Sequence, residues 1–405
     1  MKKYILLFAF LLISSVCFAA PDPVVLEKAN NAEASYLANL ETLVNIDTGT
    51  GYKDGLIKAA RILEGKLKEL GATVEVTPAA DNIAGENIRA TWEGTGKGKL
   101  LLLTHLDTVY KTGTAASRPF KVEGRRAYGP GVSDEKSGVA LGLEVMRILQ
   151  EIGYANFAKV TWLINPDEEK GSFGSRELIM KEAQLHDYTL CLEPGGSNDT
   201  VTVWRKGIGY YILKVKGKAA HAGGSPEKGL NAAMEIAHQV LQLSNLNDPK
   251  KGTTLNWTVI KAGGASNVIP EDAMAQADVR VLYPEEYDRL SNDINRIIKN
   301  KLIPDTTITF EPQRGRPPFP QNDKTDALAV KMQAIYAELG KKLATAGSGG
   351  GSDANYAASV GAVAIDGLGP VGGKGHTDEE YVELDSLASR IYLLTRAIMD
   401  LGAGK

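Results

Sequence analysis

Residues 158–172 read AKVTWLINPDEEKGS, an apolar run that ends in two adjacent glutamates. A short apolar run followed by turn-forming residues is typical of a strand buried in a parallel sheet. Glu168 and Glu169 would then lie where the strand ends, although neighbouring carboxylates raise each other's pKa. The pair is either part of a solvated turn or two groups with different roles, one binding a metal ion and the other moving protons.

The same strand pattern recurs in LLLLTHL (100–106) and YTLCLEP (188–194), and helical patterns alternate with it. EASYLANLETLVNI (33–46) and DGLIKAARILEGKLKELG (54–71) carry apolar residues at helical spacing, and Gly71 is suited to end the second helix. Strands that alternate with helices predict an α/β domain with a parallel sheet.

From Gly207 the pattern changes to the order βαββαβ. We expect strands at 209–217, 254–263, 273–283 and 306–312, and helices at 226–244 and 285–302. This order is that of a ferredoxin-like sandwich. The α/β pattern resumes afterwards, so the sequence predicts a ferredoxin-like module (207–313) inserted between the two parts of the larger domain (21–206 and 314–405).

Composition indicates a globular protein of about two domains. The chain has 405 residues, of which 43% are hydrophobic and 23% charged, and its formal net charge is -3. It contains no long run of like charges. Because nucleic-acid-binding surfaces are strongly basic, we expect no nucleic acid partner.

The first residues predict a secretory signal over 1–20. Two lysines precede an apolar run (4–13), and small residues follow at Ala19 and Ala20. The run is too short to be a stable membrane anchor, so we expect a secreted, periplasmic protein. Cleavage would leave Cys191 as the only cysteine, so the core or a metal ion must supply the stability that disulfides give many exported proteins.

Several metal-ligating side chains follow apolar segments. His105 and Asp107 come at the end of a predicted strand and, being two residues apart, share one face. The carboxyl ends of strands are where sites assemble in open α/β sheets. Five further candidates follow other segments, namely Asp134, Glu168, Glu169, Glu193 and His376. Each one alone is more simply a cap or a turn residue, but together they suit a hydrolytic dinuclear zinc site.

Competing catalytic motifs do not fit. The sequence has no H-E-x-x-H zinc motif and no G-x-S-x-G nucleophile elbow. Gly367, Gly369 and Gly372 match G-x-G-x-x-G, but the residues that follow do not form a helical pattern. We interpret this stretch as a loop carrying His376 and not as a nucleotide site.

A family resemblance rests on an ordered set of motifs: THLDTVY, YGPGVSDEKSG, NPDEEKGSFGSRELI, LCLEPG, GKAAHAGGSPEKGLNA, SNVIP, ADVR, RGRPPF, GGGSDANYAA and GHTDEEYV. In this order they resemble the di-zinc metallopeptidase family of aminoacylase and carboxypeptidase G, over nearly the whole chain after the signal. The resemblance implies a three-layer, zinc exopeptidase-like catalytic domain with an inserted lid and dimerisation domain. The carboxypeptidase G branch is the most similar, which implies release of C-terminal glutamate from folate-like N-acyl glutamates.

The resemblance also implies a role for each metal ligand. His105 and Glu193 would bind one zinc ion, Glu169 and His376 a second one, and Asp134 would bridge the two ions.

Further roles concern proton transfer and the dimer. Glu168 would be the general base, and on an extended segment its side chain would point away from that of Glu169. Asp107 would orient His105. His221 would reach the site of the partner subunit in a homodimer and stabilise the oxyanion.

Substrate carboxylates require fixed cations, and arginine binds them through two hydrogen bonds. We expect Arg280 and Arg316 to bind substrate, with Asn267 as a polar partner and Gly350 in a loop that offers backbone N–H groups. For Arg280 the simpler alternative is an arginine on a strand surface.

Two alternatives to a glutamate carboxypeptidase remain open. A related aminoacylase, dipeptidase or desuccinylase would use the same metals on other N-acyl amino acids. A non-catalytic periplasmic binding protein would lack the base or part of the ligand set, whereas Glu168 and all five ligand positions are present in this chain.

Overall fold

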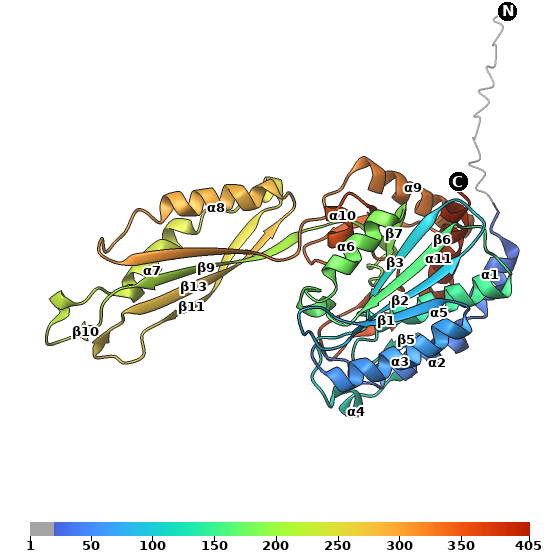
Figure 1. Ribbon diagram of the computed structural model, residues 1–405, viewed down its shortest axis with the longest axis horizontal. Coiled ribbons are helices and arrows are strands. Elements are labelled where there is room, and N and C mark those ends of the chain that lie inside the picture. Colours follow the sequence, from blue (N-terminus) through green and yellow to red (C-terminus); the bar gives the residue numbers. More distant parts are fainter. Residues whose placement is uncertain (1–19) are drawn as a thin grey trace, which may run out of the picture.

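The computed structural model describes residues 20–405. The predicted secretory signal falls almost wholly on residues 1–19, outside the described residues. Figure 1 shows two bodies side by side, a larger one built around a six-stranded sheet and an elongated one built around a four-stranded sheet.

The larger sheet has the strand order β1-β2-β6-β3-β7-β16. Its strands are β1 (Thr73–Pro78), β2 (Glu86–Glu93), β6 (Lys159–Asn165), β3 (Lys99–His105), β7 (Tyr188–Cys191) and β16 (Val363–Ile365). The last four of these run parallel, whereas β2 is antiparallel to both of its neighbours. The predicted parallel strands therefore lie at the centre of the sheet.

Helices cover both faces of this sheet, and the leucines of β3 alternate between the two cores that lie under these helices. Leu100 and Leu102 pack into the core that includes side chains of α5 (Lys136–Glu151) and α11 (Leu387–Gly402). Leu101 and Leu103 pack into a second core with side chains of α6 (Arg176–Leu185) and α10 (Ala354–Ser359). The predicted three-layer α/β fold is thus confirmed.

Shorter elements complete the larger body. The remaining helices are α1 (Pro23–Asn30), α2 (Glu33–Val44), α3 (Lys53–Glu69), α4 (Thr114–Ser117) and α9 (Asp323–Glu338). A small sheet has the order β17-β18-β5-β4, from Gly372–Gly373, Tyr381–Glu383, Arg126–Tyr128 and Lys121–Glu123, and β8 (Thr200–Arg205) pairs with β15 (Ala344–Ser348). Gly71 has φ 81° and follows Leu70, the residue that caps α3, as expected of a glycine that ends a helix.

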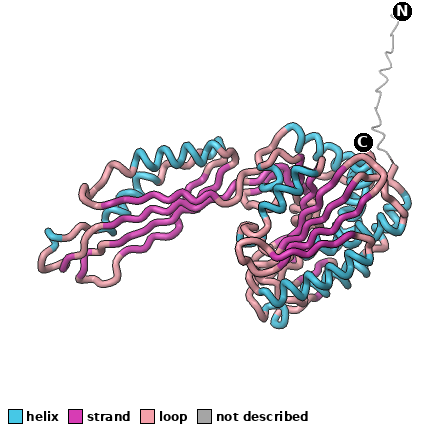
Figure 2. Tube along the Cα trace, in the orientation of Figure 1, coloured by secondary structure: helices cyan, strands magenta, loops and turns pink. Residues whose placement is uncertain are grey.

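The second body has the order β11-β13-β9-β14, and all neighbours are antiparallel. Its elements in chain order are β9 (Gly207–Lys216), α7 (Ala232–Leu243), β11 (Thr254–Ala262), β13 (Asp272–Val281), α8 (Glu285–Ile297) and β14 (Thr307–Arg314). This is the predicted βαββαβ order. Figure 2 shows its long strands running beside one another with both helices on one face. The limits 207 and 313 for an inserted domain stay a prediction.

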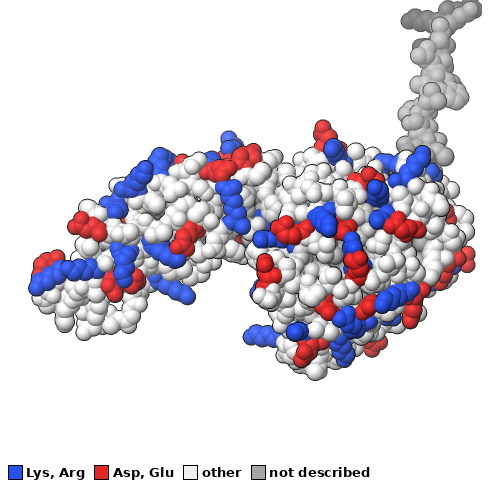
Figure 3. Space-filling view, in the orientation of Figure 1, with Lys and Arg blue, Asp and Glu red and all other residues white. Residues whose placement is uncertain are grey.

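The surface shown in Figure 3 mixes charges of both signs over the two bodies. Among residues 20–405, none of the helices combines the length and the apolar character needed to span a bilayer.

Candidate metal centre

The parallel strands bring the predicted ligands to one edge of the larger sheet. His105 is the last residue of β3, Glu168 and Glu169 follow the end of β6, and Glu193 lies two residues beyond β7. Because β3 pairs in parallel with both β6 and β7, these three strands end at the same edge. The ends of central strands therefore supply four of the candidate side chains.

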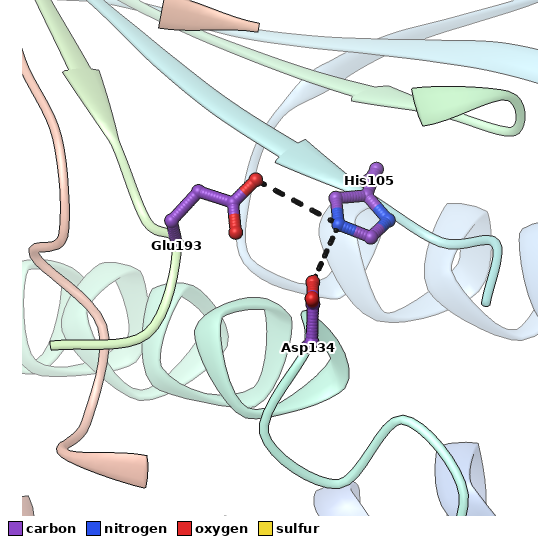
Figure 4. A group of neighbouring side chains, drawn as sticks. All are labelled: His105, Asp134 and Glu193. Carbon is purple, nitrogen blue, oxygen red and sulfur yellow. Dashed lines mark hydrogen bonds and ion pairs between the residues drawn. The ribbon is translucent and has the colours of Figure 1, made fainter. Parts of the chain in front are cut away.

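One group of ligands consists of His105, Asp134 and Glu193 (Figure 4). His105 Nε2 lies 3.0 Å from Asp134 Oδ1 and 3.8 Å from Glu193 Oε1. His105 is 1% exposed and Glu193 is 7% exposed. A buried nitrogen and two carboxylates thus point toward one another.

The second group consists of Asp134, Glu169 and His376. His376 Nε2 lies 3.3 Å from Asp134 Oδ2 and 3.3 Å from Glu169 Oε2. Asp134 therefore contributes one oxygen to each group. In both groups the candidate ligand atoms lie within 4.8 Å of one another, so the five predicted ligands come together in two sets that share Asp134.

The charges of these groups fit a cation. Burial disfavours the charged form of His105, but hydrogen bonds with Asp107 and Asp134 outweigh it and raise the pKa of this histidine. Hydrogen bonds with Asp134 and Glu169 raise the pKa of His376 to about 10. Excess negative charge thus attracts protons to nitrogens that can also bind metal.

One ligand atom also lacks a partner. Glu169 Oε1 is buried and accepts no hydrogen bond from the described residues. A buried oxygen without a partner is costly, and oxygen and imidazole nitrogen are ligands that zinc accepts. The donor set therefore fits zinc ions at both groups.

Asp107 connects His105 to the two glutamates. Its backbone carbonyl lies 3.0 Å from His105 Nδ1, and its Oδ1 lies 3.3 Å from the same nitrogen. The same carboxylate accepts the backbone N–H of Glu168 at 2.9 Å and that of Glu169 at 3.2 Å. It also accepts the hydroxyl of Thr50 at 2.6 Å. Asp107 is fully buried, so it holds both the imidazole and the backbone of the glutamate pair.

The segment of the two glutamates differs from the extended conformation that we expected. Glu168–Lys170 forms a 3-10 turn, because Asp107 binds the backbone N–H groups at its start and Gly171 ends it with φ 99°. The side chains nevertheless diverge. Glu169 lies beside His376, whereas Glu168 Oε1 lies 2.8 Å from Arg316 Nη2.

Glu168 is buried beside one arginine. Burial raises the pKa of its carboxyl to about 8, although the positive charge of Arg316 opposes this. A carboxyl whose pKa lies near neutrality suits proton transfer at neutral pH.

The loop before α5 carries Asp134, whose side chain points to the two histidines and caps no helix. Burial opposes its ionisation, but the hydrogen bonds with His105 and His376 outweigh this and lower its pKa. A cis peptide bond joins it to Glu135, whose Oε2 accepts the backbone N–H of His105 at 2.8 Å. Sequence reasoning gave no role to Glu135 or to Glu380, which binds the same loop.

A pocket of about 460 Å³ adjoins the metal ligands. Its lining includes Glu168, Arg280, Arg316, Gly350 and His376. The Arg280 guanidinium is paired with Asp278, with Nε 2.9 Å from Oδ1. Three of the four predicted substrate-binding residues thus line one pocket next to Glu168.

Arg316 is the more constrained of the two arginines. It is 4% exposed and donates to Asp353 Oδ1 at 2.9 Å, to the carbonyl of Glu168 at 2.6 Å and to the hydroxyl of Ser172 at 2.9 Å. Its contacts therefore position the glutamate turn, in addition to any contact with substrate.

His221 and Asn267 lie elsewhere. His221 belongs to β10 (Ala220–His221), which pairs with β12 (Val268–Ile269) at the end of the second body remote from the larger sheet (Figure 1). His221 is exposed, and its Nδ1 accepts the backbone N–H groups of Gly223 and Gly224. Asn267 is also exposed. Within this one chain, the two residues are not part of the metal centre.

Comparison with known proteins identifies the family. Residues 101–400 match the model of peptidase family M20/M25/M40. The chain belongs to this family. Carboxypeptidase G2 of Pseudomonas sp. (strain RS-16) is 42% identical over 387 residues, which cover 95% of this chain and 93% of that protein. A succinyl-diaminopimelate desuccinylase of Cupriavidus pinatubonensis is 29% identical, over 80% of this chain and 88% of the relative.

Solved structures of the M20 type share the fold. The aminopeptidase PepT from Bacillus cereus superposes with a TM-score of 0.80 at 22% identity, covering 92% of this chain and 99% of the other. Human carnosine dipeptidase 1 gives a TM-score of 0.70 at 14% identity, covering 95% of this chain and all of the other. The metal-ligand edge thus lies in a fold that this chain shares with an aminopeptidase and a dipeptidase.

Proposed function

We propose that this M20 peptidase is a di-zinc carboxypeptidase that releases C-terminal glutamate from folate-like N-acyl glutamates. The observation that carries the proposal is the pair of ligand groups that share Asp134 beside the buried Glu168. The similarity to carboxypeptidase G2 over nearly the full length supports the choice of reaction.

Each ligand group would hold one zinc ion. His105 and Glu193 serve the first ion, Glu169 and His376 the second, and Asp134 serves both. When bound, such ions polarise the carbonyl of the scissile amide and lower the pKa of a water molecule.

Glu168 is the proton carrier in this proposal. Its buried carboxylate takes a proton from the attacking water and delivers it to the nitrogen of the leaving amino acid, which breaks the amide bond. Arg316 holds the backbone carbonyl and the carboxylate of Glu168 at once, so the base is fixed before substrate arrives. Glu169, held toward His376, stays a ligand.

The pocket beside Glu168 would bind the C-terminal glutamate. Arg280 is 28% exposed at its side chain and reaches the carbonyl of Gly349 at 3.4 Å, so it can turn to a substrate carboxylate with little loss of burial. The neighbouring Gly350 is exposed and offers its backbone to the ligand. Arg316 and Asn267 remain further candidates for contact with substrate.

A homodimer would complete the site. His221 and Asn267 are exposed at the remote end of the second body, which suits a role in the site of another copy. His221 of the partner subunit would stabilise the oxyanion of the tetrahedral intermediate. We also propose that the chain is exported to the periplasm by the signal predicted over residues 1–20.

The decisive experiment combines a metal assay with hydrolysis of a folate-like substrate. The purified protein should contain two zinc ions per chain, release glutamate, lose activity with a chelator and regain it with zinc. Protein without bound zinc and without zinc-dependent hydrolysis would overturn the proposal and favour a binding protein.

A panel of substrates tests the specificity. N-acyl glutamates should be hydrolysed faster than N-succinyl diaminopimelate and dipeptides, which the similarity to a desuccinylase makes the main alternatives. Arg280→Ala should raise KM for the glutamate substrate more than Arg314→Ala, which removes an exposed arginine paired with Asp288. Equal kinetics in both variants would exclude a role for Arg280 in binding substrate.

A further inference from the structure

A buried carboxylate lies beneath the loop that carries Asp134. Glu380 is 1% exposed and accepts three backbone N–H groups, from Gly131 at 3.1 Å, Ser133 at 2.8 Å and Asp134 at 2.9 Å. Successive N–H groups of a turn that converge on one anion form a nest. The side chain of Glu380 thus fills an anion site made by the backbone next to the shared ligand.

The other side of the same loop is held by a buried lysine. Lys136 is 1% exposed, and its Nζ donates to the carbonyl of Pro130 at 3.3 Å and to that of Ile46 at 3.0 Å. The amide groups of the loop therefore face the carboxyl of Glu380, while one of its carbonyl groups accepts a hydrogen bond from Lys136 Nζ. Because both side chains are buried and hydrogen-bonded to the loop, the loop has little freedom to shift Asp134.

Glu380 is also tied to the segment of the exposed ligand His376. The hydroxyl of Tyr110 lies 2.6 Å from Glu380 Oε2 and 2.8 Å from the carbonyl of Thr377, the residue after His376. Arg118 supports this link, since its Nη1 donates to the same carbonyl at 3.0 Å. The loops of two metal ligands thus meet at one carboxylate.

We propose that Glu380 is the positioning residue of the metal centre, which fixes Asp134 directly through the backbone and His376 through Tyr110. The inference rests on the proposed metal function. Its physical basis is that a carboxylate offers several acceptor sites whereas a carboxamide offers one oxygen. In Glu380→Gln, at least one N–H of the nest loses its acceptor.

The test measures zinc binding to the full chain after chelator treatment, by competition with a metal-binding dye that resolves two sites. Glu380→Gln should bind zinc 10- to 100-fold more weakly at both sites, the range found for groups that orient metal ligands. Tyr110→Phe keeps the three backbone bonds to Glu380 and removes the hydroxyl that contacts both Glu380 Oε2 and the carbonyl of Thr377. It should lower the zinc affinity of only one of the two sites, the one formed with His376.

Glu379→Gln is the matched control, because it changes the adjacent glutamate, whose side chain is 71% exposed and, among residues 20–405, pairs only with Lys374. It should bind zinc as the unaltered chain does. A merely structural role predicts lower thermal stability in Glu380→Gln with unchanged zinc affinity, and this result would overturn the inference. If Glu380→Gln does not fold, Tyr110→Phe is the deciding variant. Zinc affinities at both sites equal to those of the unaltered chain would then refute the link from Glu380 to His376 through Tyr110.

The unaltered chain separates the two hypotheses. Tight zinc binding there together with wild-type affinity in Glu380→Gln contradicts only the inference. A failure of the unaltered chain to bind zinc overturns the proposed function and the inference with it.

Discussion

The carboxylate of Asp107 accepts the backbone N–H of Glu168 at 2.9 Å, so a side chain at the end of one strand fixes the turn that follows the next. The same group lies 3.3 Å from the imidazole of His105. The carbonyl of Asp107 lies 3.0 Å from the same imidazole, so one buried residue sets the position of a proposed metal ligand and of the proposed base together. This explains how two adjacent glutamates can present their side chains to different partners.

Replacing Asp107 with Asn should weaken zinc binding by about 10- to 100-fold, because the amide cannot accept from both glutamate N–H groups and orient His105. Thr50→Val removes only the hydroxyl bond to Asp107 and should have a smaller effect. Zinc affinity measured by chelator competition tests whether Asp107→Asn has the larger effect of the two. A larger loss in Thr50→Val than in Asp107→Asn would contradict it.

Substitutions of the two adjacent glutamates form a matched pair of variants. Glu168→Gln should lower kcat by about 100- to 10,000-fold, as expected when a general base is lost, while zinc content stays at the level of the unaltered chain. Glu169→Gln should lose zinc, since it replaces a buried ligand oxygen beside His376. Elemental analysis and steady-state kinetics on the same samples distinguish the two. Full activity in Glu168→Gln would rule out its role as base.

The sequence could predict the strand ends because apolar runs and the polar residues after them are local signals. His105, Glu168 and Glu193 follow such runs, and parallel pairing then brings them to one edge. The resemblance to known metallopeptidases supplied the division of the ligands between two ions. The fold class and the family were therefore accessible before any coordinates.

Other features depend on contacts between distant parts of the chain. Glu380 follows Glu379 directly, and contacts with Tyr110 and with the N–H groups of Gly131, Ser133 and Asp134 distinguish the buried carboxylate from the exposed one. The turn at Glu168 was mistaken for an extended segment, because the bonds that shape it come from Asp107. Local patterns carry no information about such partners.

The buried His186 should make stability depend on pH. Its Nδ1 lies 2.7 Å from the carbonyl of Glu182, its Nε2 lies 2.8 Å from the hydroxyl of Thr161, and burial lowers its pKa. In the unfolded chain this histidine has its ordinary pKa of about 6.5, so below that pH the unfolded chain binds more protons than the folded chain. The free energy of unfolding therefore decreases as the pH falls through that value. Denaturant unfolding at pH 5, 6 and 7 should show a shallower decrease in His186→Gln. An equal decrease in both proteins would exclude this histidine as a cause.

Packing against one helix gives the last prediction. Gly142 lies within α5, where alanine would ordinarily stabilise a helix by about 1 kcal/mol. A Cβ at this position would lie 2.5 Å from Cη2 of Trp162, which is fully buried. Overpacking of a tight core costs about 1–3 kcal/mol, so Gly142→Ala should lower the free energy of unfolding. Gly65→Ala in α3, where a Cβ meets no atom within 4 Å, should raise it by about 0.5–1 kcal/mol. Equilibrium denaturation of both variants checks the contrast, and stabilisation by Gly142→Ala would show that α5 can move away from Trp162.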